Sequence, residues 1–87
     1  MNIRLSALLL RFADYERVVY MEADTLSEAL TQLTRKHPRL RPVLLDGSGH
    51  LQRVHQVLLN GELISSNGDR PLRESDEIEL VTAASGI

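Results

Sequence analysis

The chain of 87 residues contains no cysteine, which excludes disulfide bonds, zinc–thiolate sites and thiol nucleophiles on its side chains. It also lacks runs rich in proline, glycine or serine, and its 43% hydrophobic and 25% charged residues are typical of an ordered globular protein. A chain of this length is enough for one hydrophobic core. We therefore expect a single domain over residues 1–87.

Long apolar runs are absent as well. No stretch reaches the roughly 18 apolar residues of a membrane span, and the first ten residues carry Arg4 and Ser6 without a small-residue cleavage site. We expect neither a membrane helix nor a signal peptide, and a cytoplasmic location is predicted. The net charge of -2 lacks the basic excess that indicates a nucleic-acid partner.

No group of residues has the pattern of a catalytic or metal site. The segment Asp46–Gly49 lacks the lysine and the helix start of a phosphate-binding loop. His37, His50 and His55 lack the spacing of metal ligands, and we expect them at surface or turn positions. These absences predict a protein without catalytic activity, metal or cofactor of its own.

The first part of the sequence predicts a hairpin followed by a helix. Apolar residues over Ile3–Phe12 fall on both alternation sets, as in a central strand, and Arg17–Met21 is rich in strand-forming residues. The short break between them favours an antiparallel hairpin. Thr25 and Glu28 have the spacing of a capping box, so a helix should begin there and end near Pro38.

The remaining sequence predicts three strands after an irregular segment. Residues 40–45 are apolar and should form an irregular or single helical turn under the sheet. Strands are expected over Arg53–Leu59, Glu62–Ile64 and Glu77–Val81, with Asn60-Gly61 suited to a type I′ turn between the first two. Residues 65–70 are expected to form a loop, which Pro71-Leu72 attaches to the core.

The element order therefore predicts an α+β fold. The first and last strands are the most apolar, which favours a mixed four- to five-stranded sheet in which both are central and one main helix packs across one face. That arrangement is the β-grasp, or ubiquitin-like, fold.

Three segments resemble the MoaD/ThiS family of sulfur carriers. Val57–Glu62 matches an apolar strand ending in Asn-Gly-Glu, Pro71–Ile78 matches a Pro-Leu-x-x-Gly-Asp-Glu-Val/Ile segment, and Ala84–Gly86 matches the small-residue end of the chain. Gly86-Ile87 replaces the usual Gly-Gly, and Ser75 replaces a usual glycine. The first hairpin is also predicted to be shorter than in molybdopterin-synthase small subunits, whose first connection usually carries an extra turn of helix.

The resemblance implies a carrier that catalyses nothing itself. An E1-like enzyme would use ATP to adenylate the C-terminal carboxylate, and conversion to a thiocarboxylate would deliver sulfur to an acceptor enzyme in cofactor or metabolite biosynthesis. A flexible tail over residues 82–87, with Ala84, Ser85, Gly86 and Ile87 as the carrier end, suits a narrow cleft. The β-branched Ile87 crowds the reacting carbonyl, and the resemblance implies that a metalloprotease can remove it.

A frayed terminus without chemistry is the alternative interpretation of this tail. The chain would then be a ubiquitin-like binding module or subunit that acts through its sheet surface, and its tail could be deleted without consequence. Leu58, Leu63 and Leu80 are predicted to form an exposed apolar patch for a partner on the sheet face away from the helix.

Basic residues gather after the predicted helix. They form either a patch for an acidic partner or a phosphate, or simply the solvated end of the helix. The residues are Arg35, Lys36, Arg39, Arg41 and Arg53.

Overall fold

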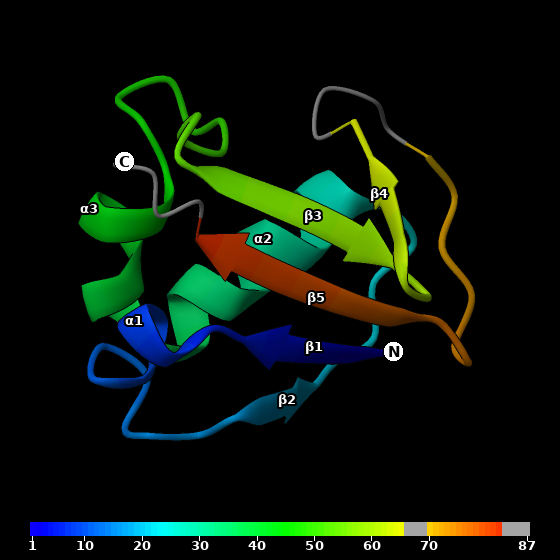
Figure 1. The fold of residues 1–87 in the computed structure, drawn as a ribbon, viewed down its shortest axis with the longest axis horizontal. Coiled ribbons are helices and arrows are strands. Elements are labelled where there is room, and N and C mark those ends of the chain that lie inside the picture. The colour runs from blue at the N-terminus through cyan, green and yellow to red at the C-terminus, as the bar shows by residue number, and fades with distance from the viewer. Residues whose placement is uncertain (66–69, 83–87) are drawn as a thin grey trace.

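The computed structural model describes residues 1–65 and 70–82, which form one five-stranded sheet with helices beside it (Figure 1). In chain order the elements are β1 (Asn2–Leu5), α1 (Ala7–Leu10), β2 (Val18–Tyr20), α2 (Leu26–Lys36), the 3-10 turn η1 (Pro38–Leu40), α3 (Arg41–Leu44), β3 (His55–Leu59), β4 (Glu62–Ile64) and β5 (Glu77–Thr82). Within these described ranges, none of the helices has the length and apolar content needed to cross a membrane.

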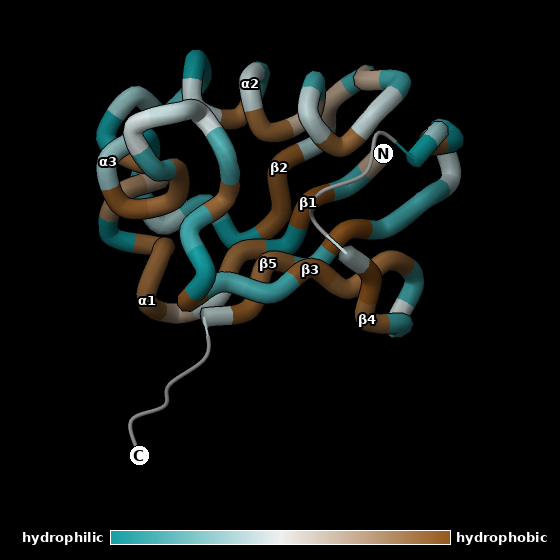
Figure 2. The backbone as a smooth tube through the Cα atoms, turned by 90° about the horizontal axis from the view of Figure 1, so that it is seen from above, coloured by the Kyte–Doolittle hydropathy of each residue, from teal (hydrophilic) through white to brown (hydrophobic). Residues whose placement is uncertain are grey.

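The strands are arranged in the order β2-β1-β5-β3-β4, so the first and last strands are both inside the sheet, as predicted. β1 and β5 run parallel, with Ile3 beside Ile78 and Leu5 beside Leu80, whereas the other neighbouring strands are antiparallel. The helix α2 crosses one face of this sheet (Figure 2). The predicted β-grasp arrangement is therefore confirmed.

The core lies between α2 and the sheet face that it covers. Successive strand side chains alternate between the two faces, whereas apolar residues of a helix at i, i+3, i+4 and i+7 share one stripe. The strands contribute buried Ile3, Leu5, Val19, Val57, Ile78 and Leu80, and α2 contributes Leu26, Ala29, Leu30 and Leu33.

The helix α2 begins at the predicted cap. Thr25 Oγ1 accepts a hydrogen bond from the backbone N–H of Glu28 at 3.2 Å. The Glu28 carboxylate accepts instead from Gln32 Nε2, one turn along the helix, at 3.2 Å. The hydroxyl half of the capping box is thus formed, and Pro38 begins the next turn after the helix.

The connection between β1 and β2 differs from the prediction. The expected strand Ile3–Phe12 ends at Leu5, and Ala7–Leu10 forms the helix α1, so the expectation of a first connection without a helical turn is wrong. The reason is tertiary: Leu9 turns into the core with 1% exposure, while Leu8 remains 63% exposed. A single helical turn satisfies this pattern, whereas a continued strand would place Leu8 and Leu10 together on one face.

The hairpin after α3 follows the prediction closely. β3 begins two residues later than expected, and Asn60 and Gly61 have φ values of 52° and 86°, as a type I′ turn requires. β5 extends to Thr82, which pairs with His55. The predicted tail boundary at residue 82 is therefore corrected, because Thr82 is part of the sheet.

The segment before β5 is attached to the helix layer, as predicted. Pro71 forms an isolated bridge with Thr25, and Leu72 is only 9% exposed. Residues 66–69 of the predicted loop lie outside the described residues. Ser75 has no positive φ, so serine in place of the family's glycine requires no strained backbone.

Candidate functional site

The end of β5 is held by a chain of polar contacts. Thr82 Oγ1 lies 3.1 Å from Ser6 Oγ and 3.2 Å from His55 Nδ1. His55 Nε2 donates to the backbone carbonyl of Val43 at 2.9 Å. In the neutral imidazole Nδ1 is then an acceptor, so Thr82 donates to His55 and accepts from Ser6. Thr82, the last described residue of β5, is thus bonded directly to Ser6 and His55, and through His55 it is linked to Val43.

A cavity of about 580 Å³ opens beside this network. Its apolar lining includes Leu8 and Phe12 from α1 and the turn after it, Pro42 and Val43 from α3, and Val54. Thr82 also lines the cavity. α1, α3 and the end of β5 lie at the same end of the molecule (Figure 1). The root of the C-terminal segment is therefore next to a hollow that is lined mainly by apolar side chains.

The outer sheet face carries part of the predicted apolar patch. Leu58 lies directly opposite Leu63 in the β3–β4 pair, and Leu63 is 59% exposed. Leu80 is wrongly assigned to this patch, because it pairs with Val57 on the helix side and is fully buried. Val81, one residue later, shares the outer face with Leu58 and is half-buried.

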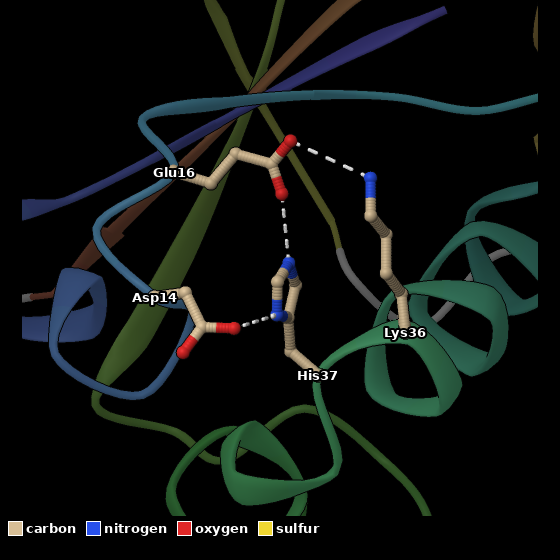
Figure 3. A network of polar contacts seen from close by, with 4 residues as sticks. All are labelled: Asp14, Glu16, Lys36 and His37. Carbon is tan, nitrogen blue, oxygen red and sulfur yellow. Dashed lines mark hydrogen bonds and ion pairs between the residues drawn. The ribbon is translucent and has the colours of Figure 1, made fainter.

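Of the three histidines, only His55 contradicts the predicted surface or turn position, because it is buried in β3, whereas His37 and His50 lie in bends. His37 and His55 are each only 7% exposed, whereas His50 is exposed in its turn. His37 Nε2 lies 2.9 Å from Glu16 Oε1, and Nδ1 lies 3.8 Å from Asp14 Oδ2 (Figure 3). The hydrogen bond from His37 is the largest cause that lowers the pKa of Glu16 below its ordinary value, and Lys36 Nζ, 3.4 Å from Glu16 Oε2, acts in the same direction.

The predicted carrier residues Ala84, Ser85, Gly86 and Ile87 lie outside the described residues. In the ranges 1–65 and 70–82, no group of three histidine, aspartate or glutamate side chains could hold a metal ion. The cavity was not predicted from the sequence. Leu8 and Val54 read as strand residues, and only the exposure of both side chains in the folded chain reveals a shared surface.

Comparison with known proteins extends over nearly the whole chain. A model of the ThiS family matches residues 3–86, while no curated protein sequence matches. Small archaeal modifier protein 1 from Haloferax volcanii is 30% identical to this chain. The match covers 99% of this chain and 97% of that protein, with a TM-score of 0.81. The protein of the same name from Methanosarcina acetivorans is 25% identical, with 98% and 93% covered and a TM-score of 0.84.

A third solved structure is similar in fold. A chain of the BexX/CysO complex from Amycolatopsis orientalis is 18% identical, with 98% of this chain and 97% of that chain covered and a TM-score of 0.85. The family model and these solved structures therefore match nearly the same residues of this chain.

Proposed function

The chain belongs to the ThiS family of ubiquitin-like carriers, and from this premise we propose that it carries sulfur as a thiocarboxylate on the carboxylate of Gly86. The observation that supports the proposal most strongly is the family match, which extends to residue 86 and therefore includes the glycine that would react. Within this proposal the chain is the substrate of a partner enzyme and supplies no catalytic group.

The chemistry requires two steps in that partner. The Gly86 carboxylate attacks the α-phosphorus of ATP, pyrophosphate leaves, and an acyl adenylate forms. A hydrosulfide then attacks the acyl carbon, and AMP leaves with the electron pair of the C–O bond. The product is a thiocarboxylate, which an acceptor enzyme consumes. The BexX/CysO structure is itself a complex of two different proteins, which supports a protein partner for this chain.

Removal of Ile87 precedes these steps in the proposal. Ile87 follows Gly86 directly, and its β-branched side chain would crowd the carbonyl that nucleophiles must approach. A trimming metalloprotease would leave a glycine, which has no Cβ to obstruct the narrow cleft of an adenylating enzyme. The polar network of Thr82, Ser6 and His55 holds the end of β5, and the proposal takes this strand end as the point of attachment of the reacting tail.

The test uses the full chain and a variant that ends at Gly86. Each is incubated with the E1-like enzyme of the same organism, ATP and sulfide, and intact mass is measured. The Gly86-ended chain should exchange one oxygen for sulfur at least about tenfold faster than the full chain, because one obstructing group in a tight site costs this much or more. A variant ending at Ser85 is the control and should not be activated. If the full chain and both shortened variants show the same negligible conversion to the thiocarboxylate, the proposal is contradicted.

A second candidate function is attachment to other proteins. The relatives from Haloferax volcanii and Methanosarcina acetivorans are named modifier proteins, and attachment would use the same adenylated carboxylate. Mass spectrometry separates the two: a thiocarboxylate adds sulfur to the free chain, whereas attachment yields lysine-linked conjugates of higher mass.

The binding-module alternative makes an opposite prediction about the tail. It rests on the exposed Leu63 and the half-buried Leu58 opposite it on the outer sheet face, which could hold a partner without any terminal chemistry. Deletion of residues 83–87 should leave such a function intact, whereas it should abolish the function of a carrier. Complementation of a deletion strain with the shortened chain distinguishes these cases.

A further inference from the structure

The cavity beside Thr82 exposes apolar side chains that a folded domain usually covers. Leu8 is 63% exposed and Val54 is 42% exposed, and both line the same hollow. Covering a leucine or valine side chain fully contributes about 1.5–3 kcal/mol, so two of them in one concave site provide a strong anchor for an apolar group. Among the described residues, none of those that line this cavity is acidic.

Its surroundings are positively charged. Arg11 lines the cavity, Arg41 precedes the lining residue Pro42, and Arg53 lies between the lining residues Gln52 and Val54. All three arginines are exposed, and none forms an ion pair within the described part of the chain. Arg39 lies over the Phe12 ring, 5.9 Å from its centroid, which adds a fourth positive charge to the rim.

The carboxylates of this end of the molecule have other partners. Asp14 and Glu16 face His37, and Glu16 also pairs with Lys36 (Figure 3). Asp46 accepts hydrogen bonds from the backbone N–H groups of Ser48 and His50 in its own turn. Arg11 in the cavity wall, Arg39 over the Phe12 ring, and Arg41 and Arg53, which are next to lining residues in the chain, are therefore available to an external negative charge. Of the basic cluster predicted from the sequence, Lys36 pairs with Glu16, and Arg35 lies in the last turn of α2 and does not line the cavity. The other three members are Arg39, Arg41 and Arg53.

We propose that this cavity is a docking site for an acidic segment of the enzyme that takes up the C-terminal residues, and that the segment inserts one aliphatic or aromatic side chain between Leu8 and Val54. The positive charge of the nearby arginines favours acidic residues on either side of the inserted side chain. The apolar wall of the cavity favours an apolar inserted side chain. The inference rests on the proposed carrier function, because it assigns the occupant to the partner in that reaction.

Distance supports the assignment. Thr82 lines the cavity, and Gly86 is four residues further along the chain, so the two are separated by at most about 14 Å of extended backbone. An enzyme with its reacting groups at Gly86 must therefore come close to this part of the surface. Contacts at the cavity would orient the carrier, whereas contacts at the tail alone would leave it free to rotate.

The first experiment measures the affinity of the E1-like enzyme for variants of the full chain. Val54→Asp places a negative charge in the cavity, and Val18→Asp is the matched control, because Val18 is 39% exposed on β2 and does not line the cavity. Arg11→Glu is compared in the same way with Arg73→Glu, which precedes the opposite end of β5. We expect Kd to rise about tenfold or more for the two cavity variants and less than twofold for the controls.

The second experiment tests the cavity without the enzyme. The isotopically labelled full chain is titrated with an acidic peptide that has a central phenylalanine and, in parallel, with the same peptide carrying alanine instead. The phenylalanine peptide should shift the methyl signals of Leu8, Val43 and Val54 and bind about tenfold more tightly than the alanine peptide. Equal binding of both peptides, or shifts confined to other residues, would show a general attraction between charges and overturn the docking site.

The outcomes separate this inference from the proposed function. If the variant that ends at Gly86 is never activated, the carrier function fails, and with it the assignment of the occupant to that enzyme. If the wild type is activated but Val54→Asp and Arg11→Glu retain its Kd, the carrier function stands and the docking site is refuted. Self-association of the wild type that Val54→Asp abolishes would identify a second copy as the occupant and refute the enzyme. Unchanged melting temperatures of the variants exclude unfolding as the cause.

Discussion

At the scale of single residues, Asn60 links two turns that are distant in the sequence. Its backbone has a φ of 52°, its side-chain Nδ2 donates to Asp76 Oδ1 at 3.0 Å, and its Oδ1 accepts from the backbone N–H of Glu77 at 2.9 Å. Asp76 Oδ2 in turn accepts from the backbone N–H of Arg73 at 2.7 Å. The Asn-Gly dipeptide therefore does more than form a hairpin, because it also fixes the start of β5.

Two substitutions separate these roles of Asn60. Asn60→Gly removes the side-chain hydrogen bonds but tolerates the backbone conformation, and should cost about 1–2 kcal/mol of unfolding free energy. Asn60→Ala should cost about 1 kcal/mol more, because alanine also disfavours a positive φ. Urea denaturation measures both values. Equal losses for the two variants would contradict a contribution from the backbone conformation.

One residue of the apolar patch predicted from the sequence, Leu80, was assigned wrongly. Leu58 and Leu63 are opposite each other across a predicted hairpin, so the turn Asn60-Gly61 was sufficient to place them on one face. Leu80 belongs to another strand, and no local signal fixes the register of β5 against β3. A shift by one residue exchanges Leu80 for Val81 on the outer face, and only the folded sheet shows which of them it carries.

At the scale of elements, α1 depends on one buried side chain. A helix of four residues, Ala7–Leu10, has too few hydrogen bonds to be stable alone, so packing must hold it. Leu9 is 1% exposed, whereas Leu8 beside it is 63% exposed. The sequence did not predict this helix because one turn is too short to show a helical period.

The contrast between these leucines can be tested directly. Leu9→Ala should destabilise the protein by about 2–5 kcal/mol, since it removes a buried side chain and leaves a cavity. Leu8→Ala, with the same chemical change in the same helical turn, should change stability by about 0.5 kcal/mol or less. Thermal and urea unfolding of the two variants check the difference. Similar losses in both would mean that α1 packs through Leu8 as well.

Elements that carry their own local signals were predicted well. The helix α2 has an apolar stripe in its own sequence and is flanked by a capping residue and a terminating proline, and the strand–turn–strand unit around Asn60 has a turn dipeptide. The end of β5 has no such signal. Thr82 belongs to the strand because Ser6 and His55, both remote in sequence, provide its hydrogen-bond partners.

At the scale of the whole molecule, segments from the two ends of the described chain meet at the centre of the sheet. β1 and β5 pair in parallel although more than 70 residues separate Asn2 from Glu77, its partner. Their apolar composition predicted this central position, because inner strands of a sheet are covered most completely. The arrangement also brings Thr82 next to α1 and α3, and so creates the cavity from segments that no sequence motif connects.

Three carboxylates distributed over the fold predict its response to acid. The pKa of Glu16 is lowered chiefly by the hydrogen bond from His37, that of Asp46 by backbone N–H groups of His50 and Ser48, and that of Asp76 by the backbone N–H of Arg73. A carboxyl group with a lowered pKa binds fewer protons in the folded than in the unfolded state. Its stabilising contribution is therefore present above its ordinary pKa and is lost as the pH falls through the lowered value.

We accordingly expect the free energy of unfolding to fall as the pH drops below the ordinary values of 4.5 for Glu16 and 3.8 for Asp46 and Asp76. Glu16→Gln and Asp76→Asn should each be less stable than the wild type at neutral pH, with a shallower loss of stability in acid, because each takes up fewer protons on unfolding. Urea unfolding at a series of pH values measures this slope. Glu62→Gln is the control, since Glu62 is exposed and forms no ion pair in residues 1–65 and 70–82, and it should retain the wild-type slope. If Glu16→Gln and Asp76→Asn retain that slope too, acid sensitivity arises elsewhere in the chain.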